Sequence, residues 1–176
     1  MAKAPRYYWD ACSWIALIKR ESGRYESLRY IIEQAMKNEV EIWTSAFTLA
    51  EVFKKNCGTD QNGLPQSGDR DFEDYILQDF VHLAQVDVDV GTAARRLLRM
   101  FPVIRKPPDG IHAATAILND ADELHTFDGC DLLAVDGKLP KRDGSFLKIC
   151  KPPPRPDPNA GTLFESGKSD EDESKP

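Results

Sequence analysis

The chain has 176 residues, the size of a single domain, since one hydrophobic core commonly serves about 100 to 200 residues. Hydrophobic residues make up 41% of the sequence, enough for a core that needs neither disulfides nor a structural metal. The formal net charge of -6 excludes a protein that holds nucleic acid through a general positive field, so a polyanionic substrate must be held by local groups.

The longest apolar runs, residues 114–118 and 132–135, are far shorter than the ~20 residues of a membrane span. Residues 1–9 contain no secretory signal. The cysteines are widely scattered, with no CxxC pair and no Cys/His cluster, which predicts reduced thiols rather than a zinc site. The sequence therefore predicts a cytoplasmic protein that does not enter a membrane.

In the first half of the chain, strand-like and helical patterns alternate. Residues 7–9 form a short aromatic strand that ends at Asp10, and residues 40–43 form a strand in which apolar residues alternate with Glu. Apolar residues at helical spacing predict helices at residues 13–20, 25–38 and 46–56. Thr44 and Ser45 offer the N-cap of the third helix.

The second half begins with a loop at residues 57–69, rich in Gly, Asn, Gln and Pro. Helices are predicted at residues 71–83, 90–101 and from 107 onward, strands at 85–88, 124–127 and 146–150, and a short apolar segment at 132–135. Asp89 is predicted to cap the helix at 90–101, and Pro107 and Pro108 suit the first turn of the next helix.

This alternation predicts an α/β fold, a three-layer α/β/α sandwich with a mostly parallel central sheet. Residues 1–150 are predicted to form the domain. From Lys151 onward the chain contains five closely spaced prolines and then an acidic run of Ser, Asp and Glu, so residues 151–176 are predicted to be a disordered tail.

Two carboxylates follow predicted strands, at the carboxyl edge of the sheet where active sites of such folds collect. Asp10 follows the first strand and Asp128 follows the strand at 124–127, so folding can bring them together across 118 positions. The alternative is structural, because Asp is common in turns and Asp128-Gly129 is a favoured turn pair. Asp131 is either a fifth ligand or a loop residue that contacts solvent.

Two further carboxylates lie on predicted helices. Glu51 borders the buried face of the helix at 46–56, although Lys55 at the next turn could make an ordinary surface ion pair with it. Asp109 opens the helix after Pro107-Pro108, where free backbone amides stabilise a carboxylate. That placement explains a capping role and also favours the ionised, metal-binding form.

The combination resembles the PIN-domain nucleases, a family that includes the VapC-type toxins of toxin–antitoxin pairs. The resemblance runs from about Tyr7 to Cys150. Its motifs are the strand Tyr-Tyr-Trp-Asp10, the helix Ala-Phe-Thr-Leu-Ala-Glu51, the alanine-rich helix Pro-Pro-Asp109-Gly-Ile-His-Ala-Ala and the strand Leu-His-Thr-Phe-Asp128. Cys12 is a departure, because the family often has Ser, Thr or Asn there.

The resemblance implies a metal-dependent ribonuclease that hydrolyses RNA phosphodiester bonds, a homodimer, and an antitoxin partner if the chain is a toxin. Mg²⁺ or Mn²⁺ suits oxygen ligands from separate elements. The expected ligands are Asp10, Glu51, Asp109, Asp128 and Asp131, and the first four are the expected catalytic residues. In this hypothesis Asp10 and Asp109 hold the principal ion, Asp128 completes its coordination, and Glu51 orients or deprotonates the attacking water.

Other interpretations remain open from the sequence. A noncatalytic PIN-like module would be expected to lack some of the carboxylates, and an aspartyl phosphatase usually has a second acid where this chain has Cys12. Basic residues at 95–106 either hold RNA or form a solvated face. His112, one turn after Asp109, either reaches the site or packs behind it. His82 and His125 are predicted to be structural.

Overall fold

The computed structural model of the chain describes residues 3–52 and 66–157. Within these residues one sheet contains β1 (Arg6–Trp9), β2 (Glu41–Ser45), β3 (Val81–Ala84), β4 (Glu123–His125) and β5 (Lys148–Cys150). The strand order is β3-β2-β1-β4-β5, and every neighbouring pair is parallel. Strand β1 is therefore central, with β2 on one side and β4 on the other.

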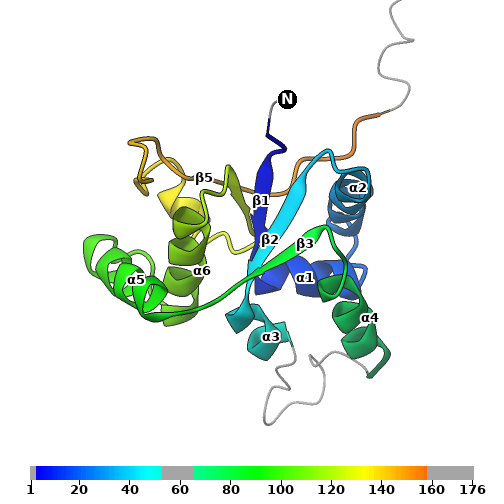
Figure 1. The fold of residues 1–176 in the computed structure, drawn as a ribbon, viewed down its shortest axis with the longest axis horizontal. Coiled ribbons are helices and arrows are strands. Elements are labelled where there is room, and N and C mark those ends of the chain that lie inside the picture. Colours follow the sequence, from blue (N-terminus) through cyan, green and yellow to red (C-terminus); the bar gives the residue numbers. More distant parts are fainter. Residues whose placement is uncertain (1–2, 53–65, 158–176) are drawn as a thin grey trace, which may run out of the picture.

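Helices cover both faces of this sheet (Figure 1). The helices of the described residues are α1 (Ala11–Ile18), α2 (Tyr25–Met36), α3 (Ala46–Val52), α4 (Gln66–Ile76), α5 (Val88–Met100) and α6 (Pro107–Leu118), and a short 3-10 helix, η1, spans Leu133–Val135. Helices α5 and α6 lie on one side, and α1, α2 and α4 lie on the other. The predicted α/β/α sandwich with a parallel sheet is confirmed.

Successive residues of β1 build the two halves of the core, because side chains alternate between the faces of a strand. Tyr8 packs in the cluster formed with α5 and α6, together with residues such as Leu97 and Ala113. Trp9 packs on the opposite face with Trp14 and with residues of α2. Both are fully buried, so the strand that leads to Asp10 is fixed from both sides.

The structure differs most from the prediction in the segment around β3. The helix predicted at 71–83 is α4, which ends at Ile76, and the strand predicted at 85–88 lies at Val81–Ala84 instead. Pairing with β2 satisfies the backbone groups of Val81–Ala84, and helical spacing in a short apolar run cannot reveal that pairing. The alternating Val86 and Val88, which imitate a strand, are exposed.

Smaller corrections concern element ends. Asp87, not Asp89, caps α5, since its side chain accepts a hydrogen bond from the N–H of Val90 at 3.0 Å. Strand β4 ends at His125, so Asp128 is separated from it by Thr126 and Phe127. Residues 66–69 of the predicted loop belong to α4. The predictions for residues 53–65 fall outside the described part of the chain.

The beginning of the predicted tail continues along the domain. Pro152 is buried, and the Arg155 guanidinium contacts α2 through an ion pair with Glu33 at 3.2 Å and a cation–π contact with Tyr30. The prediction of disorder for residues 158–176 falls outside the described residues.

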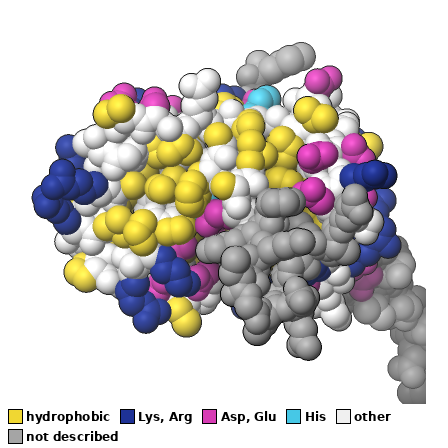
Figure 2. Space-filling model, turned by 90° about the horizontal axis from the view of Figure 1, so that it is seen from below, with side chains coloured by type: hydrophobic (Ala, Val, Ile, Leu, Met, Phe, Trp, Pro, Cys, Tyr) yellow, Lys and Arg dark blue, Asp and Glu magenta, His cyan; other side chains and the backbone are white. Residues whose placement is uncertain are grey.

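Hydrophobic side chains gather on the face of the molecule shown in Figure 2. Among the exposed large hydrophobic residues, Leu49 lies on α3, and Leu83, Val86 and Val88 lie on the segment from β3 to the start of α5. None of the helices in residues 3–52 and 66–157 is both long and apolar enough to cross a bilayer.

Candidate active site

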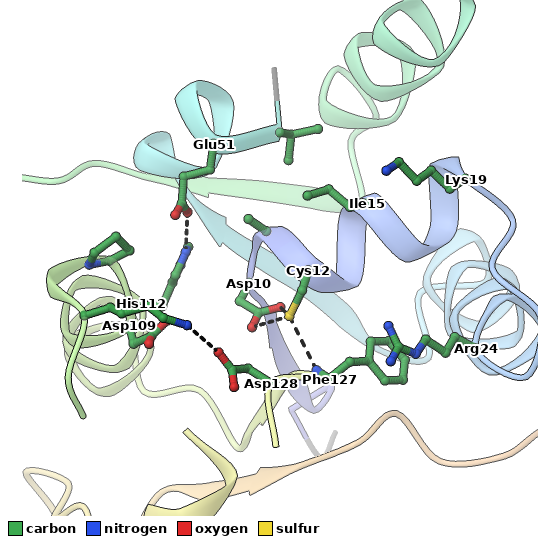
Figure 3. A pocket seen from close by; sticks show the side chains of 14 residues that line it. Asp10, Cys12, Ile15, Lys19, Arg24, Glu51, Asp109, His112, Phe127 and Asp128 are labelled. Carbon is green, nitrogen blue, oxygen red and sulfur yellow. Dashed lines mark hydrogen bonds and ion pairs between the residues drawn. The ribbon is translucent and has the colours of Figure 1, made fainter. Parts of the chain in front are cut away.

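A pocket of about 530 Å³ lies at the carboxyl end of β1, where this central strand gives way to α1. Its walls come from α1, α3, α6 and the segment after β4 (Figure 3). The four predicted catalytic carboxylates all line it: Asp10, Glu51, Asp109 and Asp128. We call it the carboxylate pocket. Asp131, the fifth predicted ligand, does not line it but lies close to Asp109 and Asp128 and is fully buried.

Asp10 is held by the start of the helix that follows it. It caps α1, because its Oδ1 accepts a hydrogen bond from the N–H of Ser13 at 3.0 Å. The Cys12 thiol lies 3.0 and 2.9 Å from the two carboxylate oxygens, and burial, reinforced by the charge of Asp10, raises the pKa of this thiol. The thiol therefore stays protonated and donates a hydrogen bond to the Asp10 carboxylate.

Glu51 is positioned by a buried histidine. Its Oε2 lies 2.6 Å from Nε2 of His112, whose Nδ1 lies 2.9 Å from the Tyr8 hydroxyl. An ionised carboxylate only accepts, so Nε2 donates to Glu51, and in a neutral ring Nδ1 then accepts from Tyr8. Burial raises the pKa of Tyr8, so its hydroxyl keeps its proton. Lys55 lies outside the described residues.

Asp109 is the most strongly perturbed carboxylate of the pocket. It lies in the first turn of α6 after Pro107-Pro108, is 9% exposed, and finds no hydrogen-bond partner for its buried Oδ2 among the described residues. Burial raises its pKa to about 6, and the charges of Asp128 and Asp131 act in the same direction while Lys106 opposes them. A buried carboxylate oxygen of this kind is suited to a cation.

The negative charge of Asp128 is better compensated than that of Asp109. Burial acts to raise its pKa, but hydrogen bonds from the N–H of Cys130 and from the Lys106 ammonium outweigh burial and lower the pKa. Its own N–H donates to the Thr126 hydroxyl at 3.0 Å, which fixes the turn after β4. Asp128 is therefore ionised and rigidly placed.

Both carboxylate oxygens of Asp131 lie near a cation. Its Oδ1 accepts two hydrogen bonds from the Arg105 guanidinium, at 2.9 and 2.8 Å. Its buried Oδ2 has no hydrogen-bond partner among the described residues and lies 3.6 Å from the Lys106 ammonium. Two members of the predicted basic stretch, Arg105 and Lys106, thus neutralise carboxylates, whereas Arg95 and Arg96 are exposed on α5 and do not line the carboxylate pocket.

The donor set of the pocket fits a hard divalent cation. Ligand oxygens of Asp109, Asp128 and Asp131 lie within 4.8 Å of one another, and Asp10 and Glu51 line the same pocket outside this tight group. All donors are carboxylate oxygens, which Mg²⁺ and Mn²⁺ prefer. Mutual repulsion and the partnerless Oδ2 of Asp109 are the features that a bound cation would relieve.

A second titratable cluster lies elsewhere in the sheet. His125 is fully buried, its Nε2 is 2.8 Å from Glu123, and Cys150 on β5 lies 3.4 Å from the same carboxylate oxygen. The Trp9 indole donates to Nδ1 of His125 at 3.2 Å, so Nε2 carries the proton and donates to Glu123. That tautomer has no free lone pair for a metal, and His125 is structural here as predicted.

The sequence leaves the role of His112 open and does not reveal its partners. The distance in sequence hides the contacts of His112 with Tyr8 and Glu51, since 104 and 61 positions separate these residues. Arg24 and Phe127 line the pocket as well, and only the position of Phe127 next to Asp128 could have indicated this.

Comparisons with known proteins agree with the fold. No protein with a curated description matches the chain. Among solved structures, Mycobacterium tuberculosis VapC20, a toxin that cleaves the sarcin-ricin loop, is 17% identical with a TM-score of 0.53, over 70% of this chain and 90% of that one. A Klebsiella pneumoniae toxin–antitoxin complex is 20% identical with a TM-score of 0.53, over 85% and 99% of the two chains.

The FitAcB structure of Neisseria gonorrhoeae is 15% identical with a TM-score of 0.51, over 83% of this chain and 97% of that one. At these identities the similarity shows a shared fold. The PIN domain family model matches residues 7–137. This match runs from β1 past η1 and includes all five predicted carboxylates, so the chain belongs to the PIN-domain family.

Proposed function

We propose that the chain is a divalent-metal-dependent ribonuclease that hydrolyses RNA phosphodiester bonds. The observation that carries the proposal is the meeting of Asp10, Glu51, Asp109 and Asp128 in one pocket, from four separate segments of the chain. A noncatalytic module has no need to bury carboxylates against one another, because burying charged groups without a partner is costly. Membership of the PIN-domain family supports the same activity.

In this proposal Asp10, Asp109 and Asp128 hold Mg²⁺ or Mn²⁺, and the buried Asp131 carboxylate, close to Asp109 and Asp128, supports them. The bound cation would neutralise the carboxylates, polarise the phosphodiester and lower the pKa of water. Glu51 orients the attacking water or accepts its proton, and His112 keeps the Glu51 carboxylate turned toward the pocket. The Cys12 thiol likewise keeps the Asp10 carboxylate in place, through a hydrogen bond to its Oδ2.

The biological setting is also a proposal. Structures with this fold include toxin–antitoxin complexes, which supports the role of a cytoplasmic toxin that a small partner protein inhibits. The exposed hydrophobic residues of α3 and of the β3–α5 segment offer a surface for that partner or for a second copy in a homodimer.

A cleavage assay tests the proposal. Single-stranded and structured RNAs are incubated with wild-type protein in Mg²⁺, in Mn²⁺ and in chelator, beside Asp10→Asn. We expect cleavage that requires the metal and falls by about 100-fold or more in Asp10→Asn, since loss of a fixed electrostatic group costs on that order.

The matched control is Asp120→Asn. Asp120 is exposed at the end of α6, and its backbone has a φ of 54°, which asparagine adopts readily. This variant should cleave like wild type. Cleavage retained by Asp10→Asn, or wild-type protein that binds RNA but cuts none in either metal, would contradict the proposal and favour the noncatalytic module.

A further inference from the structure

The carboxylate pocket has two chemically different ends (Figure 3). Glu51, Asp109 and Asp128 form the acidic end. Asp10 lies between this end and the other. The other end is formed by Ile15 and Lys19 of α1 and its C-cap, by Arg24, and by Phe127. The first end suits a cation and the scissile phosphate. The second end offers positive charge and an aromatic ring to whatever extends beyond that phosphate.

The positive, aromatic end is built around a stacked pair. The Arg24 guanidinium carbon lies 4.6 Å from the centroid of the Phe127 ring. Arg24 also pairs with Glu21 at 2.8 Å, and its side chain keeps 43% of its surface exposed. The guanidinium therefore lies over the Phe127 ring, and part of its surface stays open to solvent at the pocket.

The backbone of Phe127 is tied to the acidic end of the pocket. The Phe127 N–H donates to the Cys12 sulfur at 3.5 Å, and that thiol contacts both oxygens of Asp10. The next residue along the chain is Asp128, whose N–H is held by Thr126. The ring therefore extends from backbone that is tied to two of the carboxylates, which keeps it beside the acidic end.

We propose that Arg24 and Phe127 form a nucleotide subsite, in which one unpaired base of single-stranded RNA stacks on the pair beside the scissile phosphate. This inference rests on the proposed function and adds the part of the substrate that the pocket recognises. Bases of single-stranded RNA stack on aromatic rings and on guanidinium planes. Lys19, on the same side, adds positive charge for the adjoining backbone.

The charge distribution favours this surface over the alternative on α5. Because the chain has a net charge of -6, RNA must be held where cations face the reactive groups. Arg95 and Arg96 are exposed on α5 but do not line the carboxylate pocket, whereas Arg24 and Lys19 do. The pocket volume of about 530 Å³ is within the range of sites that enclose small ligands.

RNA binding tests the subsite separately from cleavage. The protein carries Asp10→Asn so that the RNA stays intact, and its affinity for a fluorescent single-stranded RNA is measured by anisotropy in Mg²⁺. We expect Phe127→Leu, which keeps apolar bulk but loses the ring, to weaken binding by roughly 5- to 100-fold, the range of one lost base stack. Arg24→Lys, which keeps the charge but loses the plane, should also weaken binding, and Arg95→Lys should leave it unchanged.

A second arm asks whether a base is the group that stacks. An abasic site is moved along the RNA one position at a time. At one position beside the cleaved bond, base removal should weaken binding to the parent protein and cause no further loss in Phe127→Leu. The subsite is overturned if Phe127→Leu and Arg24→Lys bind like the parent, or if the abasic effect is the same with and without the ring. A change in melting temperature without a change in affinity also overturns it, since the pair is then only structural.

The two proposals fail in different ways. Metal-dependent cleavage whose KM does not respond to Phe127→Leu or Arg24→Lys in the otherwise wild-type chain would refute the subsite and leave the nuclease. RNA binding that depends on Phe127, without cleavage by the wild-type protein in either metal, would refute the nuclease and leave the subsite.

Discussion

Asp109 is the carboxylate of the pocket whose ionisation the folded protein disfavours most. Its pKa of about 6 is caused first by burial and then by the neighbouring carboxylates. Because the folded-state pKa lies above the unfolded value of 3.8, the folded state binds the proton more tightly between pH 4 and pH 6. The contribution of Asp109 to the stability of the metal-free protein should therefore fall as the pH rises through this range.

Asp109→Asn removes the free-energy cost of ionising this buried carboxyl group. At pH 7.5 in chelator we expect the variant to melt several degrees above wild type, by roughly 2 kcal/mol in the free energy of unfolding. The lost interaction of a carboxylate with the helix N-terminus is smaller, about 0.5 kcal/mol, and does not reverse the sign. Differential scanning calorimetry at pH 7.5 and pH 4 measures the effect.

The difference in melting temperature should shrink strongly at pH 4, where Asp109 is protonated in the folded state. Mg²⁺ should stabilise the wild type but not Asp109→Asn. Asp120→Asn serves as the control and should show neither effect. A variant that is less stable than wild type at pH 7.5 in chelator would show that the carboxylate is compensated without a metal.

Helix α6 carries Asp109 and His112 on one turn, and this could be predicted only in part. The Pro-Pro-Asp109 start of the helix and its alanine-rich body were read correctly from the sequence. The role of His112 was left open, because its partners come from β1 and α3 and are set by tertiary packing. The same limit explains β3, where pairing with β2 decided between a helix and a strand.

His112→Ala tests whether α6 positions Glu51. We expect the rate of RNA cleavage to fall by about 10- to 100-fold, as is usual for a residue that orients a reactive group, with little change in KM. His112→Gln should restore part of the rate, because its amide can still donate to Glu51. Steady-state kinetics at saturating Mg²⁺ measure both effects.

His82→Ala is the matched control, since His82 lies on β3, stacks on Trp43 and does not line the pocket. Its kinetics should match those of wild type. Equal rates for His112→Ala and wild type would mean that Glu51 needs no orienting partner. A loss of stability without the partial recovery in His112→Gln would mean that His112 serves only the core.

At the scale of the whole molecule, the sheet order explains how distant carboxylates meet. Strands β1 and β4 are neighbours, so the segments that follow them bring Asp10 and Asp128 to the same edge. The sequence predicted this because both residues follow strands, and a parallel sheet places such ends together. It could not predict that Asp131 pairs with Arg105, or that Arg24 stacks on Phe127, because both contacts depend on where the loops pack.

The central claim is that these carboxylates together hold one divalent centre. Isothermal titration calorimetry tests this claim most directly, because it measures binding without any RNA. Mn²⁺ is titrated into wild-type protein, Asp10→Asn and Asp120→Asn. We expect saturable binding to wild type and to Asp120→Asn, and affinity lower by about 10-fold or more in Asp10→Asn. Equal Mn²⁺ affinity in all three proteins would contradict the claim.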